Sequence, residues 1–197
     1  MRRVALFGGS FDPVHNAHLA LARAALGALA LDEVRWVPVG RPWQKARAIT
    51  PAVHREAMLR LALAGQARQV IERIEIEREG PSYTLQTVQA LRAREPDTAW
   101  VLLIGQDQYA GLHTWNGWRE LLALVALAVA RRPGAPAHVN PDVERAGHHA
   151  VPLPMTDISA TAIRGRVAAG LDISDLVPPE VAGYIARHGL YRSPGRS

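Results

Sequence analysis

The sequence predicts an α/β fold, a doubly wound, mostly parallel sheet with helices on both faces. Short apolar runs of strand length alternate with longer helical patterns along the whole chain. No internal repeat, low-complexity tract or long linker interrupts this alternation. The chain has 197 residues, a length that suits one domain with a sizeable core. We therefore expect a single domain over residues 1–197, with closing helices at about residues 159–191.

The expected strands are short apolar runs, and the run at residues 100–104 is the strongest of them. Residues 70–77 are also expected to form a strand, because apolar and charged side chains alternate toward the end of that run. The strands expected in the sheet cover residues 4–7, 34–37, 70–77, 100–104, 126–130 and 150–153.

The expected helices have recognisable start and stop signals. Thr50 followed by Pro51 predicts an N-cap with proline at the first helical position, and Gly65 ends that helix. The stretch 131–150 is rich in Pro, Gly and His and is expected to be a loop. Ligands of such folds bind at the carboxyl ends of the strands, where the strand order reverses. The helices expected around the sheet cover residues 16–29, 50–64, 84–94, 118–124, 159–169 and 179–188.

Composition excludes several classes of protein. The chain has no cysteine, which rules out disulfides, thiolate zinc sites and cysteine nucleophiles. Its longest apolar run, at residues 121–130, is about half of the roughly 20 residues that a membrane-spanning helix needs. The N-terminal residues resemble a signal peptide only until Gly8 and Asp12 interrupt them. We expect a cytoplasmic protein that has no membrane partner.

The formal net charge of +5 has two interpretations. It could serve an anionic partner, or it could reflect a solvated, arginine-rich surface. The chain has no basic block of five or more residues, so a nucleic-acid partner is not expected. Lys45 is the single lysine among 23 basic residues, which suggests either a specific point charge on a phosphate or chance.

A glycine turn and two histidines follow the first expected strand, where residues 7–18 read FGGSFDPVHNAH. Gly8 and Gly9 allow a tight turn and a close approach of backbone to a ligand. The helix that follows offers unpaired N–H groups to an anion. His15 and His18 are three residues apart, so both can donate hydrogen bonds to phosphate from one face. A metal pair or two surface histidines would produce the same spacing.

This string resembles the G-x-F-D-P-x-H-x-G-H signature of the nucleotidyltransferase superfamily. Ala17 stands where the signature has glycine, which narrows the access of a phosphate slightly. Residues 158–164 read ISATAIR and resemble the I-S-x-T-x-x-R signature that accompanies the first motif. Ser159 is also a good N-cap, so without the resemblance an ordinary helix start would explain this second string. The resemblance implies a Rossmann-like fold and an enzyme that transfers a nucleotidyl group.

The middle of the chain resembles bacterial nicotinate-nucleotide adenylyltransferases. The strings that carry this resemblance are GPSYTL at residues 80–85, LIGQD at 103–107, LHTW at 112–115 and ARRPG at 130–134. The resemblance extends from residue 4 to residue 191. Residues 41–45 read RPWQK where the family often has Pro-Pro-His-Lys, so the contacts of that loop are open. Without the family context, Trp115 and Trp118 would be taken as core residues.

The resemblance implies the residues of the site and the reaction. ATP would donate its adenylyl group to nicotinate mononucleotide, in NAD biosynthesis, with Mg²⁺ bridging the phosphates. Nicotinamide mononucleotide, another phosphorylated acceptor and a non-catalytic nucleotide or RNA binder stay as alternatives, and a homo-oligomer stays open. No metal cage is expected, since the adjacent His148 and His149 do not have ligand spacing. The residues implied for catalysis are His15, His18 and Arg164. Those implied for ATP are Gly8, Gly9, Ser10, Phe11, His15, His18, Lys45, Gly105, Asp107, Arg132, Ile158, Ser159, Thr161 and Arg164. Those implied for the acceptor are Thr84, Leu85, Asp107, Trp115 and Asn116.

Overall fold

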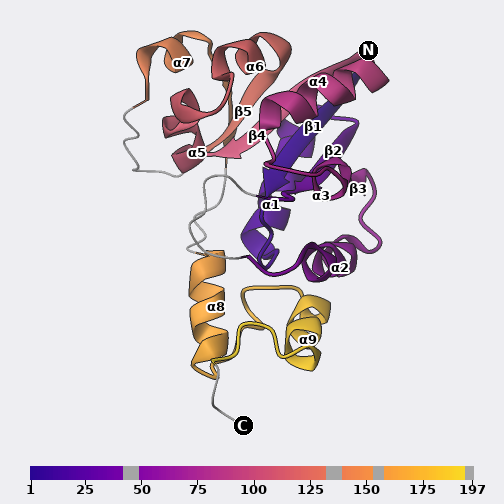
Figure 1. Cartoon of the computed structure of the whole chain (residues 1–197), viewed down its shortest axis with the longest axis vertical. Coiled ribbons are helices and arrows are strands. Elements are labelled where there is room, and N and C mark those ends of the chain that lie inside the picture. Colours follow the sequence, from indigo (N-terminus) through magenta and orange to yellow (C-terminus); the bar gives the residue numbers. More distant parts are fainter. Residues whose placement is uncertain (42–48, 132–138, 153–157, 194–197) are drawn as a thin grey trace.

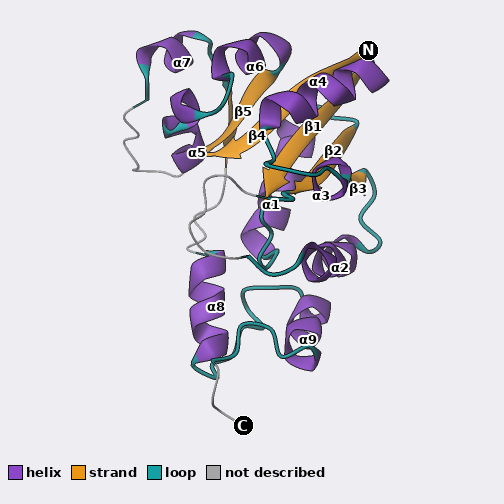
Figure 2. Ribbon diagram, in the orientation of Figure 1, coloured by secondary structure: helices purple, strands orange, loops and turns teal. Residues whose placement is uncertain are grey.

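A six-stranded, entirely parallel sheet forms the centre of the part of the chain that the computed structural model describes, residues 1–41, 49–131, 139–152 and 158–193 (Figures 1 and 2). The strand order across the sheet is β3-β2-β1-β4-β5-β6. This arrangement confirms the doubly wound fold that the sequence predicts. The strands are β1 (Arg2–Gly9), β2 (Glu33–Pro38), β3 (Gln69–Ile71), β4 (Thr98–Gly105), β5 (Ala126–Arg131) and β6 (His149–Pro152).

Helices cover both faces of the sheet (Figure 2). They are α1 (Asn16–Ala28), α2 (Ala52–Leu63), α3 (Ile74–Glu77), α4 (Thr84–Arg94), α5 (Gln106–Ala110), the 3-10 helix η1 (Leu112–Thr114), α6 (Trp118–Leu124), α7 (Pro141–Arg145), α8 (Ala160–Ala168) and α9 (Pro179–Arg187).

Alternation along the strands builds two separate cores. Ala5 and Phe7 of β1 point into one core, which the helices α1, α2, α8 and α9 complete. Val4 and Leu6 of the same strand point to the other face, where α4, α5, η1 and α6 pack. Because a central parallel strand is buried on both faces, its sequence is a continuous apolar run.

The strand order reverses at β1. The chain moves from β1 to β2 and β3 in one direction, and then returns to place β4 on the other side of β1. Leu6 accordingly pairs with Arg35 on one side and with Leu102 on the other. The connections that leave β1 and β4 therefore run over opposite faces, which opens a crevice at the carboxyl ends of these two strands.

The C-terminal helices α8 and α9 form the end of the molecule opposite the N-terminus (Figure 1). Helix α9 packs against α2, where His54 Nδ1 and the Tyr184 hydroxyl are 3.0 Å apart. Helix α9 thus lies beside α2, which follows β2, although more than a hundred residues separate the two helices in the chain.

The structure corrects two predictions about the region after β2. The strand expected over residues 70–77 ends at Ile71, and Ile74–Glu77 is a helical turn, α3. β3 lies at the edge of the sheet, and the buried Glu75 accepts a hydrogen bond from Thr87 of α4, so pairing and burial both favour the turn. The cap of α2 is also different. Pro51 occupies the N-cap position that was predicted for Thr50.

Three short helices lie in segments for which the sequence predicts none. α5 and η1 follow β4, and α7 lies within the expected loop at residues 131–150. Asn140 caps α7 by accepting a hydrogen bond from the backbone N–H of Asp142. With only three to five residues each, these helices are too short to give a periodic signal.

Candidate active site

The glycine turn at the end of β1 serves packing at one position and access at the other. A Cβ at Gly9 would lie 2.9 Å from the ring of Phe11, whereas a Cβ at Gly8 would meet nothing within 4 Å. Phe11 adopts a left-handed φ of 47° and is 1% exposed, against Phe7 and Trp36. Its side chain therefore belongs to the core, so a contact of Phe11 with a ligand would come from its backbone.

The two histidines stand together at the start of α1. Their rings stack with centroids 3.6 Å apart and planes 23° from parallel. The backbone N–H of His15 donates to His18 Nδ1 at 3.2 Å. Because Nδ1 accepts this bond, the neutral ring of His18 carries its proton on Nε2, where it can donate to a ligand. Helix α1 has no acidic residue in its first turn, so nothing there opposes an anion.

The second motif lies opposite this turn, at the start of α8. Ser159 caps the helix by accepting a hydrogen bond from Ala162 N, as the sequence predicts. Arg164 reaches the first motif, since its Nη1 donates to the main-chain oxygen of Asp12 at 2.8 Å. Its Nη2 donates to Thr161 Oγ1 at 3.1 Å. The structure thus brings Thr161 and Arg164 together with the turn that precedes His15, while Ile158 packs against the core below.

Arg55 of α2 is a site residue for which the sequence analysis gave no signal. It is 1% exposed and donates three hydrogen bonds to main-chain oxygens, to Thr50 at 2.8 Å, Ser10 at 3.0 Å and Val39 at 2.7 Å. Burial lowers the pKa of its guanidinium, and the nearby carboxylate of Asp12 opposes that shift. Arg55 therefore ties the turn after β1 to the loop after β2.

A cavity of about 140 Å³ opens beside the turn, on the face of the sheet that α4 covers. Thr84 and Trp115, two of the residues that the resemblance implies for the acceptor, line it. Leu85 is buried beneath it at 8% exposure, and Asn116 is exposed next to Trp115. The cavity is lined by Leu6, Gly8, Gly9, Ser10, Val37, Val39, Glu75, Ser82, Thr84, Thr87, Leu102, Ile104, Gln108 and Trp115. It adjoins the glycine turn, which precedes His15 and His18 in the first motif.

Glu75 is the second residue of this site that the sequence analysis missed. Its carboxyl group lies in the cavity wall and accepts a hydrogen bond from Thr87 Oγ1 at 2.8 Å. Burial raises the pKa of this carboxyl, against hydrogen bonds from Thr87 and Ser82 that lower it. The alternating pattern of residues 70–77 predicts a strand, so the sequence did not indicate that Glu75 lines the cavity.

The loop after β4 contributes the remaining residues. Gly105 ends β4 and begins α5, and its N–H donates to Oε1 of Gln108 at 3.2 Å. Asp107 is exposed in the first turn of α5 at the carboxyl edge of the sheet, where ribose hydroxyls can reach it. Lys45 and Arg132, together with Trp43 and Gln44, lie outside the described residues.

Within residues 1–41, 49–131, 139–152 and 158–193, no group of three His, Cys, Asp or Glu side chains is placed to hold a metal ion. In the same part of the chain no helix has both the length and the hydropathy needed to cross a membrane.

The chain is similar to known proteins over nearly its whole length. Residues 6–166 match the family described as "Cytidylyltransferase-like". A protein of Methylibium petroleiphilum named "Probable nicotinate-nucleotide adenylyltransferase" is 46% identical, covering 98% of this chain and 94% of its own. A protein of Bordetella petrii with the same name is 47% identical, covering 98% of this chain and 100% of its own. The chain belongs to the nicotinate-nucleotide adenylyltransferase family.

Solved structures agree with the fold of this family. The nicotinic acid mononucleotide adenylyltransferase of Plasmodium falciparum, complexed with NaAD, superposes with a TM-score of 0.81. The alignment covers 97% of this chain and 98% of that one, at 18% identity. At this identity the likeness supports the fold, whereas the bacterial relatives support membership of the adenylyltransferase family.

Proposed function

We propose that this chain transfers the adenylyl group of ATP to nicotinate mononucleotide, giving nicotinate adenine dinucleotide and pyrophosphate in NAD biosynthesis. One observation carries the proposal. The glycine turn that leads to the stacked pair His15 and His18 lines a cavity together with Thr84 and Trp115, at the point where the strand order reverses. The names of the bacterial relatives support the same activity.

The donor half of the site suits a triphosphate. His18 would donate from Nε2 to an oxygen of the α-phosphate, with His15 beside it. Ser159, Thr161 and Arg164 would bind the β- and γ-phosphates from the opposite side, where Arg164 already contacts the turn. Gly8 leaves open space for the nucleotide, and Asp107 would bind ribose hydroxyls. The implied roles of Ser10, Phe11, Gly105 and Ile158 are backbone contacts, and those of Lys45 and Arg132 stay predictions.

The acceptor half suits a planar cation that carries an anionic substituent. Trp115 would stack on the pyridinium ring, an arrangement that an indole favours. The nicotinate carboxylate would accept hydrogen bonds from backbone N–H groups at Thr84, Leu85 and Asn116. A carboxylate has two accepting oxygens and no donor, so it matches such a site better than an amide does.

The reaction needs no base. An oxygen of the acceptor's phosphate attacks the α-phosphorus of ATP, a new P–O bond forms, and pyrophosphate leaves with the electrons of the broken P–O bond. The attacking oxygen is already ionised. Positioning and charge stabilisation then supply the catalysis. We expect Mg²⁺ to enter with ATP as part of the substrate, held by phosphate oxygens, and we expect the reaction to take place in the cytoplasm as a single-domain activity.

A pyrophosphate-release assay with ATP and a panel of acceptors tests the proposal. The panel holds nicotinate mononucleotide, nicotinamide mononucleotide and phosphopantetheine. We expect the first to be preferred over the second by about tenfold or more in kcat/KM, because an amide would leave an unpaired donor in the site. If the two pyridine mononucleotides were used with comparable kcat/KM, the proposed adenylyltransferase activity would stand. The proposed preference for nicotinate mononucleotide would be contradicted. Release with none of the three would contradict the proposed function.

A further inference from the structure

We propose that Tyr191, near the C-terminus, is a positioning residue for the triphosphate side of the active site. Tyr191 follows α9 and lies 179 residues from its partner, Asp12 of the first motif. No part of the sequence analysis assigns Tyr191 a role. The proposal rests on the function proposed above, in which Arg164 and the turn after β1 bind ATP.

Asp12 is the point at which three distant segments meet. The Tyr191 hydroxyl donates to Asp12 Oδ1 at 2.8 Å, and the backbone N–H of Thr50 approaches Oδ2 at 3.4 Å. Arg164 Nη1 donates to the main-chain oxygen of the same residue. Asp12 is fully buried, so this carboxylate depends on protein donors in place of water. Loss of the Tyr191 hydroxyl would remove one of these donors.

The hydrogen bond from Tyr191 constrains a part of the turn after β1 to which Arg55 does not donate. Arg55 binds the main-chain oxygen of Ser10, two residues before Asp12. Tyr191 holds Asp12 itself, and Arg164 takes its own position from the main-chain oxygen of Asp12. A shift of Asp12 would therefore move the guanidinium of Arg164 relative to His15 and His18.

Two further properties of Tyr191 agree with a positioning role. Its backbone adopts a φ of 64°, a left-handed conformation that a bulky residue rarely takes unless its surroundings impose it. Burial, together with the adjacent Asp12 carboxylate, raises the pKa of the Tyr191 hydroxyl far above its ordinary value. The hydroxyl therefore keeps its proton, and it can donate to Asp12 at every pH at which the protein would work.

The test compares Tyr191→Phe with the matched control Tyr184→Phe. Tyr184 is also half-buried in the C-terminal region, and its hydroxyl lies 3.0 Å from His54 Nδ1 without contacting the first motif. Three quantities are measured for each variant: the affinity for a non-hydrolysable ATP analogue, the KM for ATP and the KM for the mononucleotide. Thermal unfolding shows whether each variant is folded.

We expect Tyr191→Phe to bind the ATP analogue about tenfold more weakly, as for loss of a hydrogen bond to a charged group. Its KM for ATP should rise by a similar factor, while the KM for the mononucleotide changes by less than about twofold on the same reasoning. Tyr184→Phe should leave both constants unchanged. The proposal would be overturned if Tyr191→Phe and Tyr184→Phe bound the ATP analogue equally well. It would also be overturned if Tyr191→Phe changed the KM for ATP and the KM for the mononucleotide equally.

A double-mutant cycle with Arg164→Ala supplies a second measurement. If Tyr191 acts through the position of Arg164, its removal should cost little further ATP affinity once Arg164 is gone. Independent, multiplying losses would contradict the proposal. The binding measurement uses the ATP analogue alone, so a wild type that adenylylates no mononucleotide would overturn the proposed function separately.

Discussion

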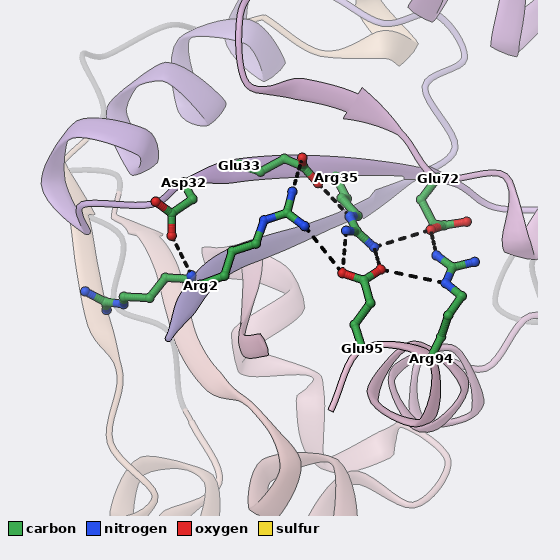
Figure 3. Close-up of polar contacts among 8 residues, drawn as sticks. Arg2, Asp32, Glu33, Arg35, Glu72, Arg94 and Glu95 are labelled. Carbon is green, nitrogen blue, oxygen red and sulfur yellow. Dashed lines mark hydrogen bonds and ion pairs between the residues drawn. The ribbon is translucent and has the colours of Figure 1, made fainter. Parts of the chain in front are cut away.

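Arginines are used in opposite ways at two places in this molecule. Beside the starts of β1 and β2, Arg35 lies among carboxylates, and each charge faces its opposite (Figure 3). At the carboxyl edge of the sheet, Arg55 donates to three main-chain oxygens, and Arg164 donates to one main-chain oxygen and one hydroxyl. Those acceptors carry no charge, so these hydrogen bonds position the guanidinium groups through main-chain and hydroxyl oxygens.

All three side-chain nitrogens of Arg35 donate hydrogen bonds to carboxylates. Arg35 Nε lies 2.6 Å from Glu33, and Nη1 and Nη2 contact Glu95 at 2.6 and 2.8 Å. Its guanidinium also lies 5.1 Å from the ring of Trp100. Burial alone would lower the pKa of Arg35, but its hydrogen bonds with Glu95 and Glu33 raise it overall. Arg2 and Arg94 extend the same network (Figure 3).

Charged groups that affect stability and charged groups that we propose for substrate binding have different partners in this molecule. Mutual neutralisation at the amino side leaves no electrostatic attraction for a ligand, and its effect is on stability. At the carboxyl side, hydrogen bonds to neutral acceptors hold two guanidinium groups beside the turn for which we propose phosphate binding. Variants in the first region should therefore change stability, and variants in the second should change substrate binding and turnover.

The largest expected effect is that of His18→Ala. Charge builds on the α-phosphate oxygens in the transition state, so the loss of the Nε2–H donor should lower kcat by about a hundredfold or more. Steady-state kinetics measures this, and thermal unfolding shows whether the variant is folded. His149→Ala, an exposed histidine of β6, is the control and should have wild-type kcat. A folded His18→Ala protein with near-normal turnover would remove His18 from the site.

Arg35→Met tests the other region. Removal of this arginine, 8% exposed in its side chain, leaves the carboxylates of Glu33 and Glu95 with the more exposed Arg2 as their shared cation. Breaking such a pair should lower the free energy of unfolding by about 2 kcal/mol, less than for a fully buried pair. Denaturant unfolding measures it, and Arg60→Met, an exposed pair with Glu56, should change it by less than about 0.5 kcal/mol. If a folded Arg35→Met protein had a lowered kcat/KM, this would contradict the prediction that variants around Arg35 change stability and not substrate binding or turnover.

Arg164→Ala should raise the KM for ATP about tenfold, as for loss of a charged hydrogen-bond donor. The KM for the mononucleotide should change much less, because Arg164 lies on the triphosphate side. Arg119→Ala is the matched control, since this exposed arginine pairs with Asp142 away from the turn. Equal effects on the two constants would mean that the start of α8 has only a structural role.

Trp115→Ala should weaken both pyridine mononucleotides by about fivefold, within the range of a cation–π contact. The indole would stack on the ring and not on its substituent, so the ratio of the two kcat/KM values should hardly change. The ratio is measured for the wild type and for Trp115→Ala with the same pyrophosphate-release assay. A large change in the ratio would place the substituent against Trp115 instead of the backbone N–H groups of Leu85 and Asn116.

The smallest expected effect is a pH dependence of stability that arises at Glu95. Its hydrogen bonds with Arg35 hold the pKa of Glu95 below its ordinary value. A depressed pKa in the folded state contributes stability that is present above the unfolded value, about 4.3, and is lost as pH falls through the folded value. Below that pH the wild type should lose more stability than Glu95→Gln does. The exposed variant Glu180→Gln should follow the wild type, and parallel curves for all three would contradict the assignment.

Much of the site could be predicted from local sequence. His15 and His18 lie three residues apart on one helical turn, and Ser159 caps α8 as its motif predicts. Thr84 and Trp115 were named from short strings, and both line the cavity. Glu75 was missed because alternation in a short segment cannot distinguish an edge strand from a helical turn. The roles of all these residues in substrate binding stay predictions.

The sequence by itself determined the class of fold and the two motifs, because strand and helix periodicity and the spacing of a motif are properties of neighbouring residues. Only the tertiary structure decided which distant groups meet. Arg55 binds oxygens of Ser10 and Val39, and Tyr191 reaches Asp12 across 179 residues. Such contacts leave no periodic signal, because they depend on how distant elements such as α2 and α9 pack against each other. Arg164 of α8 likewise meets Asp12 across 152 residues of the chain.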